Sequence, residues 1–203
     1  QRKGMPEELA QQMPLLKEVL DAMDVPRYEL AGYEADDLIG TISRRCEGAG
    51  WECVVVTGDR DSLQLITDHT KVKLVSTRMG QTTTRDMTEE AFRADYGFDP
   101  IHMVDLKALM GDASDNIPGV KGIGEKTAMA LVQMYGSVEE LYAHMPEILM
   151  APDTPAKPGV IKKLEEGRGA AAMSYRLATI VTDAPLDFVP EENLRRPVKP
   201  ELY

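Results

Sequence analysis

The sequence predicts an α/β domain with a mostly parallel sheet flanked by helices, followed by an all-helical subdomain. Three observations predict this organisation. Helical and strand-like apolar patterns alternate through the first half, strand patterns stop after Thr88, and glycines recur at short intervals between residues 111 and 124. We expect the boundary between residues 105 and 106, which gives an α/β part over 1–105 and a helical part over 106–203.

Two helices are expected in the first half. Residues 6–23 are predicted to be helical, because Pro6 suits a first helical turn and apolar residues then recur at helical spacing. Residues 34–49 form a second helix that ends at Gly48 and Gly50. The apolar face of this second helix, expected to point into the core, consists of Ala35, Leu38, Ile42, Cys46 and Ala49.

The strands of the first half are expected between and after these helices. Residues 27–31 are a short strand candidate, and residues 51–57 form a continuous apolar strand. The run of valines at 54–56 is typical of a strand buried on both faces. Residues 71–76 and 81–85 are expected to pair as a hairpin.

Short helices are expected through the second half. The apolar spacing predicts helices at 103–110, 126–135, 160–167 and 170–182. The Pro- and Glu-rich tail after Pro185 is expected to be poorly ordered.

Composition excludes some classes of protein and leaves others open. No apolar run is long enough to span a bilayer, so we expect a soluble, cytoplasmic protein without a membrane partner. The net charge of −11 argues against nucleic acid, unless many acids gather at one site where divalent cations neutralise them. The chain begins with Gln1, and we expect it to be a fragment.

Three acidic clusters stand where loops are expected to become helices. The second follows the carboxyl end of the apolar strand, which is the edge of an open α/β sheet where ligands bind. Carboxylates gathered there repel one another unless cations bridge them, and hard oxygen ligands select Mg²⁺ or Mn²⁺. The candidate catalytic and metal-binding residues are Glu34, Asp36, Asp37, Asp59, Asp61, Asp112 and Asp115. The alternative interpretation of any single cluster is helix capping, since acids in a first turn satisfy free N–H groups.

A glycine-rich hairpin follows the third cluster. Glycine allows close backbone approach, and the N–H groups of the following helix can hold a phosphate without reading the base. The alternative is an ordinary turn between two helices. The candidate DNA-binding residues of this hairpin are Gly119, Val120, Lys121, Gly122, Ile123, Gly124, Lys126 and Thr127. Lys162, Lys163 and Arg168 could extend the phosphate track, although a solvated helix face explains them as well.

Three segments together resemble one family. Residues 32–37, 57–65 and 111–128 resemble, in order, motifs of the 5′–3′ exonuclease domain of bacterial DNA polymerase I, in the flap endonuclease superfamily. The resemblance implies a PIN-like α/β core that carries a helix-three-turn-helix DNA clamp. It also implies cleavage of phosphodiesters in 5′ flaps, nicked duplexes and RNA primers with two divalent ions, and polymerase domains in the same parent chain.

The resemblance assigns roles to individual residues. Glu34 and Asp36 look like ligands of the first metal. Asp59, Asp61 and Asp115 look like ligands of the second metal or of its water shell, with Asp37 and Asp112 in support. The hairpin looks like the family's clamp on the duplex, often with a bound K⁺. Arg2 looks like the last part of the basic region that grips the scissile phosphate.

The sequence departs from the family's pattern at its beginning. The family's first strand and its early metal-binding aspartates would lie before Gln1, so cleavage by this chain alone is in question. A DNA-binding fragment without activity is therefore one alternative. A haloacid-dehalogenase-like phosphatase is another, because it also uses an Asp-x-Asp after an apolar strand, but that family gives the glycine hairpin no role. We expect a bacterial, nucleoid-associated protein that is a monomer.

Overall fold

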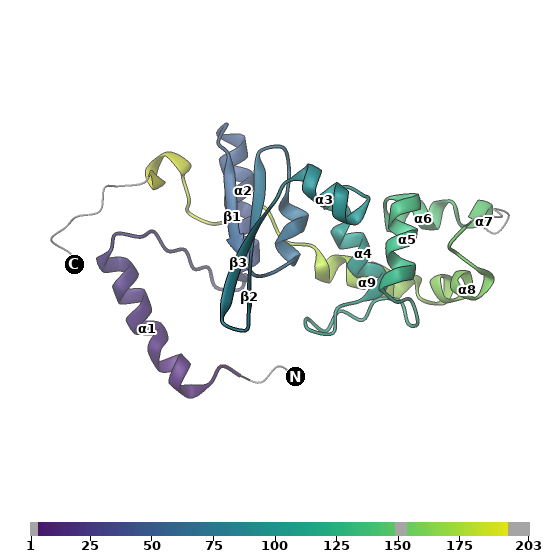
Figure 1. The fold of residues 1–203 in the computed structure, drawn as a ribbon, viewed down its shortest axis with the longest axis horizontal. Coiled ribbons are helices and arrows are strands. Elements are labelled where there is room, and N and C mark those ends of the chain that lie inside the picture. The colour runs from purple at the N-terminus through teal and green to yellow at the C-terminus, as the bar shows by residue number, and fades with distance from the viewer. Residues whose placement is uncertain (1–3, 149–153, 195–203) are drawn as a thin grey trace.

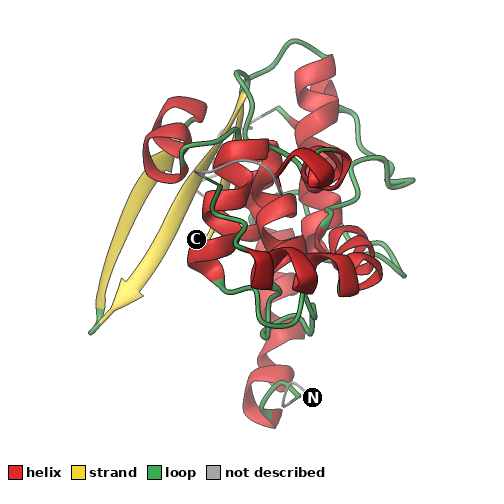
Figure 2. Ribbon diagram, turned by 90° about the vertical axis from the view of Figure 1, so that its right-hand side faces the viewer, coloured by secondary structure: helices red, strands yellow, loops and turns green. Residues whose placement is uncertain are grey.

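The chain folds into a small α/β part that continues into a bundle of short helices (Figure 1). The computed structural model describes residues 4–148 and 154–194. Figure 2 shows the strands at one side of the molecule and most of the helices at the other. An α/β part followed by a helical part is the arrangement that the sequence predicts. No helix in the described ranges is long and apolar enough to cross a membrane.

The first half has the predicted helices and one strand fewer than predicted among the described residues. Its elements are α1 (Glu7–Ala22), α2 (Ala35–Gly48), β1 (Cys53–Thr57), a 3-10 turn (Asp61–Leu65), β2 (Thr70–Arg78), β3 (Gln81–Met87) and α3 (Glu89–Tyr96). The strand expected at 27–31 is wrong, because this segment forms no ladder. Instead, Tyr28 packs edge-on against Phe188 at 5.3 Å between ring centroids.

The sheet is mixed and open on one face. In the described part of the chain it has the order β1-β2-β3, with β1 parallel to β2 and β3 antiparallel to β2, which confirms the predicted hairpin of residues 71–76 and 81–85. Val55 is buried, but Val54 is 46% exposed and Val56 is 62% exposed. The prediction of burial on both faces is therefore wrong for β1. Side chains alternate along a strand, and among the described residues one face alone meets the core.

Helix α2 packs on the buried face as expected at its centre and differs at its ends. Leu38 and Cys46 are buried, and Ile42 packs against the same cluster. Ala35 and Ala49 are exposed, so their assignment to the core is wrong. They are the first helical residue and the C-cap residue, so both lie at the ends of the helix.

The second half is helical where the sequence predicts helices. Its elements are a 3-10 turn (Pro100–His102), α4 (Met103–Met110), α5 (Glu125–Tyr135), α6 (Val138–Ala143), α7 (Met145–Ile148), α8 (Pro158–Glu166), α9 (Arg168–Ala178) and a 3-10 turn (Pro190–Asn193). Helix α9 ends four residues before the predicted Thr182. The chain beyond it runs without regular structure along α2, and its Ala184, Leu186 and Phe188 are buried. The prediction of a poorly ordered tail is therefore wrong as far as Leu194.

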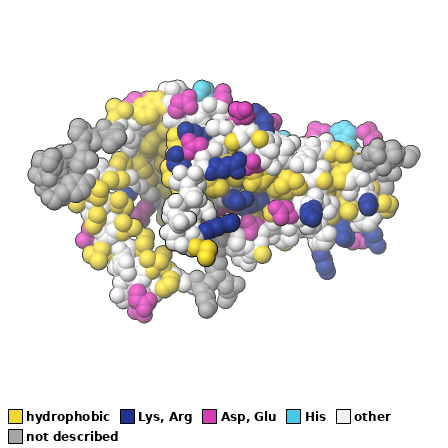
Figure 3. Space-filling model, viewed as in Figure 1, with side chains coloured by type: hydrophobic (Ala, Val, Ile, Leu, Met, Phe, Trp, Pro, Cys, Tyr) yellow, Lys and Arg dark blue, Asp and Glu magenta, His cyan; other side chains and the backbone are white. Residues whose placement is uncertain are grey.

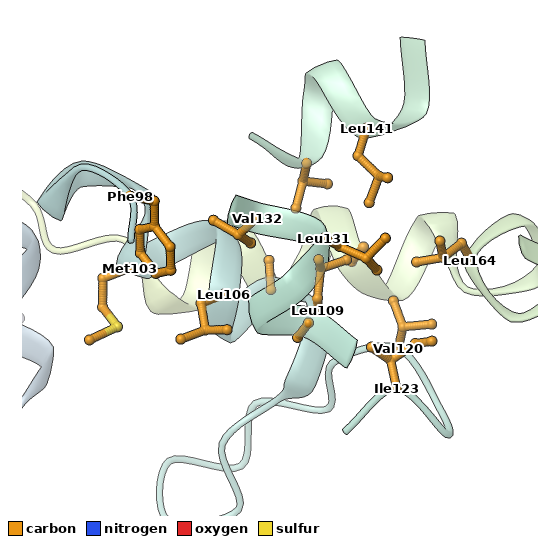
Figure 4. Packing of buried hydrophobic residues seen from close by; sticks show 14 of the residues in the cluster. Phe98, Met103, Leu106, Leu109, Val120, Ile123, Leu131, Val132, Leu141 and Leu164 are labelled. Carbon is orange, nitrogen blue, oxygen red and sulfur yellow. The ribbon is translucent and has the colours of Figure 1, made fainter. Parts of the chain in front are cut away.

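One apolar cluster runs through both halves (Figure 4). It begins at Val55 and Val72 in the sheet and continues through the helices to Leu131 and Leu164. The described helices α4 and α5 and the hairpin between them form its middle, with Leu109, Val120 and Ile123 pointing inward. Because the two halves share this core, the acidic loops of one half are held at fixed positions beside the hairpin of the other.

Candidate active site

The first acidic cluster lies at the start of α2. Glu34 is the N-cap residue, and Asp36 and Asp37 lie in the first turn. The Asp37 Oδ2 atom accepts a hydrogen bond from Glu34 N at 3.1 Å, and its Oδ1 atom accepts one from Val181 N at 2.9 Å. Asp37 therefore both caps the helix and ties it to the segment after α9. Its metal-binding role stays a prediction, and the capping interpretation explains its two backbone contacts.

The second cluster turns the chain at the carboxyl end of β1. Asp59 N donates to Thr57 Oγ1, and Asp61 N donates to Asp59 Oδ1, each at 3.0 Å. These two bonds fold the loop back on itself, so that Asp61 begins the 3-10 turn that follows. Both carboxylates are thereby held at the end of the strand.

The third cluster sits in a tight loop between α4 and the hairpin. Asp112 and Ile117 form an antiparallel bridge, with Asp112 N to Ile117 O at 2.9 Å and Ile117 N to Asp112 O at 2.8 Å. Inside this loop, Ser114 donates from its N and its Oγ to Asp112 Oδ1 at 2.8 and 2.5 Å. Gly111 has a φ of +75°, and a Cβ there would lie 2.7 Å from Ile117 O, so a glycine is needed at this position.

The three clusters meet although they lie far apart in the sequence. Two adjoining clefts of about 530 and 330 Å³ share Asp59, Asp61, Ser114 and Asp115 among their walls. The larger cleft also has Glu34, Asp36 and Asp37 in its wall, and the smaller has Asp112. All seven predicted carboxylates thus line one continuous acidic region at the carboxyl end of β1.

Arg60, Lys107 and Arg176 are basic residues of this region that sequence reasoning did not assign to the site. Lys107 of α4 is 5% exposed, and its Nζ donates to Asp61 and to Asp112 Oδ2, the latter at 2.9 Å. Arg176 of α9 lines the larger cleft. A lysine at the centre of an apolar helix is a signal that could have identified Lys107, because lysine is rarely buried without a partner. No comparable signal in the sequence marks Arg176.

The carboxylates of the region differ in their electrostatic surroundings. Burial and the charges of Asp59, Asp61 and other acids raise the pKa of Asp36. Burial also raises the pKa of Asp112, but hydrogen bonds from Ser114 and Lys107 outweigh it and lower that pKa to about 2. Asp112 is therefore ionised at any physiological pH, whereas the negative charge on Asp36 is unfavourable without a cation.

The donor atoms fit a divalent cation. One oxygen from each of Asp61, Asp112 and Asp115 lies within 4.8 Å of the other two. Mg²⁺ and Mn²⁺ bind oxygen at about 2.1 Å, so two ligand atoms on one ion stand at most about 4.2 Å apart, and a small movement closes the difference. The family resemblance implies Asp59, Asp61 and Asp115 as ligands of the second metal. The group of oxygens in the structure has Asp112 in place of Asp59.

The glycine hairpin divides into a buried part and an exposed part. Gly119, Val120 and Ile123 are buried. Gly119 N donates to Ser174 Oγ at 2.9 Å, and Val120 N donates to Leu109 O at 2.8 Å. These N–H groups are already used inside the protein, so the three buried residues pack the hairpin instead of presenting it.

The exposed part of the hairpin faces solvent at the start of α5. Lys121, Gly122, Gly124 and Lys126 are exposed, and Thr127 is half-buried. These five residues keep the predicted DNA-binding role. Arg2, the remaining predicted DNA contact, lies outside the described residues.

The three outlying basic residues have partners in the protein. Lys163 Nζ donates to Gly122 O at 3.0 Å, so it lies against the hairpin. Lys162 pairs with Glu166 at 3.8 Å, and the Arg168 guanidinium stands over the Tyr142 ring at 4.5 Å from its centroid. Lys163 is the one of the three that contacts the candidate DNA-binding surface.

Family models and relatives agree on what the chain is similar to. The model of the 5′–3′ exonuclease N-terminal resolvase-like domain matches residues 1–97, and that of the 5′–3′ exonuclease C-terminal SAM fold matches residues 98–201. The chain belongs to the 5′–3′ exonuclease family. It is 46% identical to DNA polymerase I of Bacillus subtilis over 92% of its own length and 20% of that protein. It is 45% identical to DNA polymerase I of Caldicellulosiruptor bescii over 96% of its own length and 22% of that protein.

Solved structures share the fold. The T5 5′-exonuclease with bound zinc ions is 24% identical, with a TM-score of 0.66 over 89% of this chain and 64% of that chain. The catalytic core of Rad2 in complex with a DNA substrate is 17% identical, with a TM-score of 0.55 over 92% of this chain and 59% of that one. The chain spans about a fifth of the length of the curated relatives it matches. The family match also removes the haloacid-dehalogenase-like alternative.

Proposed function

We propose that this chain is the nuclease part of a structure-specific 5′ nuclease, which hydrolyses phosphodiesters of 5′ flaps, nicked duplexes or RNA primers with two Mg²⁺ or Mn²⁺ ions. The observation that carries the proposal is the convergence of seven carboxylates, from three segments distant in sequence, beside an exposed glycine hairpin. The names of the relatives support polymerase domains on the same polypeptide. We also propose a monomer that acts in the bacterial cytoplasm at the nucleoid.

Two neighbouring surfaces of the chain have different roles: the acidic region holds the metal ions, and the exposed part of the hairpin binds the duplex. Bound divalent ions supply a water of lowered pKa and stabilise the charge on the leaving oxygen. Asp61, Asp112 and Asp115 place one oxygen each within 4.8 Å of the other two, and Glu34, Asp36 and Asp59 line the same region. No side chain is needed as the nucleophile.

The exposed hairpin residues fix the duplex relative to the acids. Backbone N–H groups near Gly122 and Gly124, with Lys121 and Lys126, suit the phosphates of one strand, which gives binding by shape and not by base. The resemblance also implies K⁺ at the hairpin backbone. In the structure the Lys163 ammonium already stands at one hairpin carbonyl, Gly122 O.

The test separates cleavage from binding on a labelled 5′-flap substrate with Mg²⁺. It compares this chain with a longer form extended upstream, each as wild type, as Asp115→Asn and as Asp68→Asn. Asp68 is a matched control, because it is exposed and lies before β2, at the opposite end of the strands. We expect Asp115→Asn to lower the cleavage rate by at least about a hundredfold while the anisotropy of labelled DNA still reports binding. Cleavage by Asp115→Asn at near the wild-type rate would contradict the metal assignment, and binding without cleavage by this chain in every form would identify it as a DNA-binding fragment.

A further inference from the structure

A buried lysine stands among the carboxylates of the candidate metal site. Lys107 lies in the middle of α4, and its side chain reaches Asp61 from one segment and Asp112 from another. Its side chain is 6% exposed, whereas the side chains of Asp61 and Asp112 are 19% and 20% exposed. The lysine side chain is therefore more buried than the carboxylates that it joins.

This position makes the ammonium the resident counter-ion of the group. Asp61, Asp112 and Asp115 bring three carboxylate oxygens within 4.8 Å of one another, and like charges at this spacing repel strongly when partly removed from water. A cation that contacts two of the three relieves that repulsion. A buried lysine without such partners would itself be unfavourable, so the lysine and the two acids stabilise one another.

The hydrogen bonds of Asp112 determine which of its two oxygens is available to a divalent ion. Its Oδ1 atom accepts two hydrogen bonds from Ser114, which uses both lone pairs of that oxygen. Its Oδ2 atom is the one left for a metal, and that oxygen is in contact with Lys107. An ion bound there would stand beside the ammonium, and the two cations would repel.

We infer that Lys107 is a positioning residue that takes the place of a divalent cation in the metal-free protein and is displaced from Asp61 or Asp112 when the cation binds. The inference rests on the proposed function, in that Asp61, Asp112 and Asp115 hold the cation. Lys107 keeps the three carboxylates together in the absence of metal, and competition with it weakens the binding of the ion. An exchangeable ion suits a site that must also bind and release a charged phosphodiester.

The alternative role for Lys107 is a direct contact with a substrate phosphate. Lys107 lines the smaller cleft, but it is only 5% exposed and its described contacts are with two carboxylates of the metal group. The two roles predict different behaviour in the absence of DNA. A phosphate contact leaves the affinity of the free protein for metal unchanged, whereas a competing cation lowers it.

The experiment measures Mn²⁺ binding to the free chain by electron paramagnetic resonance. The proteins are wild type, Lys107→Met, Lys107→Arg and the control Lys71→Met, whose lysine pairs with Asp86 on the exposed side of the sheet. We expect Lys107→Met to bind Mn²⁺ about tenfold more tightly, equivalent to about 1.4 kcal/mol. Lys107→Arg retains the charge and should bind Mn²⁺ as the wild type does, as should Lys71→Met. Without metal, Lys107→Met should have a lower melting temperature than Lys107→Arg and Lys71→Met.

The outcomes separate this inference from the proposed function. Mn²⁺ binding by the wild type, with unchanged or weaker affinity in Lys107→Met, overturns the inference and leaves the metal site standing. Absence of Mn²⁺ binding in both proteins overturns both. Because Lys107→Met could fail to fold, a second measurement follows the Lys107 Cε signal of the wild type by NMR during a titration with Mg²⁺. The signal should move as Mg²⁺ binds, and it should not move in Asp115→Asn; an unmoved signal in the wild type at saturating Mg²⁺ overturns the inference.

Discussion

The carboxylate of Asp36 lowers the stability of the folded protein. It lies in the first turn of α2, and burial together with the charges of four nearby acids raises its pKa above the ordinary value of an aspartate. The folded protein therefore holds this proton more tightly than the unfolded chain does. The carboxylate's cost to the fold appears as the pH rises through its folded pKa, and it is absent in acid, where the group is protonated in both states.

We expect Asp36→Asn to stabilise the metal-free protein and to weaken its binding of Mn²⁺. The free energy of unfolding at pH 7 should rise by up to about 1 kcal/mol, with allowance for the partial exposure of the group. The difference should shrink toward zero as the pH falls to about 3, below the ordinary pKa, because the carboxyl is then protonated in both states. Urea denaturation in EDTA at both pH values measures it, with Asp68→Asn as the control. A destabilised Asp36→Asn at pH 7 would show that the carboxylate is structurally needed.

At the scale of elements, the segment after α9 is fastened to α2 by side chains one helical turn apart. Asp37 accepts from Val181 N, Thr41 Oγ1 accepts from Ala184 N, and Arg45 donates to three carbonyl oxygens at residues 184, 186 and 188. Spacing of four residues places these side chains on one face of the helix. The segment thus holds the helix that carries Glu34 and Asp36.

Replacing Arg45 should loosen this segment. Arg45→Met leaves three backbone carbonyls without their charged donor, and we expect a loss of about 1.5–3 kcal/mol in the free energy of unfolding. Arg44→Met is the matched control, because Arg44 forms an ion pair with Glu47 on the same helix and should cost less than about 1 kcal/mol. Hydrogen exchange should also quicken at the amides of residues 180–184. Equal losses for the two variants would show that the segment adds little.

The hairpin and α8 make a second pair of elements whose contact can be tested. Lys163 Nζ donates to Gly122 O, and a Cβ at Gly122 would lie 3.0 Å from that nitrogen, so the lysine braces the turn. We expect Lys163→Met to weaken binding of duplex DNA by about two- to fivefold without changing its salt dependence. A lysine that contacts a phosphate contributes about 0.9 to the slope of log K against log salt.

Fluorescence anisotropy over a salt series measures that slope. Lys162→Met is the control, since Lys162 lies one position away and pairs with Glu166. A slope lower by about 0.9 in Lys163→Met would show that Lys163 itself contacts a phosphate.

At the scale of the whole molecule, charge and apolar surface are unevenly distributed. Hydrophobic side chains spread over α1 and the segment after it in Figure 3, while Lys and Arg gather over the β2–β3 hairpin. The described part of α1 has no buried residue, and Leu15 and Val19 on it are 60% and 54% exposed. The net charge of −11 includes the acids collected at the carboxyl end of β1.

This concentration of negative charge predicts a stabilisation specific to divalent ions. About 5 mM MgCl₂ should raise the melting temperature more than about 15 mM NaCl of equal ionic strength, because ion binding to the folded state adds to screening. The difference should disappear in Asp115→Asn and persist in Asp68→Asn. Equal shifts from both salts in the wild type would mean that screening alone acts.

Much of the fold and the identity of the acids follow from local patterns in the sequence. The sequence predicts helices at 103–110 and 126–135, each correct to within one residue, because helical spacing and flanking glycines act over a few positions. The predictions that are wrong concern residues whose burial depends on contacts with segments distant in the sequence. Val54 and Val56 have the sequence of a buried strand, yet their exposure depends on what packs on that face. Residues 183–188 have the composition of a loose tail and are held by α2.

By itself the sequence determined the family, the order of elements and the seven carboxylates, since these depend on residue types at fixed spacing. Only the tertiary structure decided which atoms are available. It engaged both oxygens of Asp37 with backbone N–H groups, buried half of the hairpin and placed Lys107 between Asp61 and Asp112. The physical reason is that pKa, burial and competition for a lone pair are set by neighbours across the core, which no local spacing specifies.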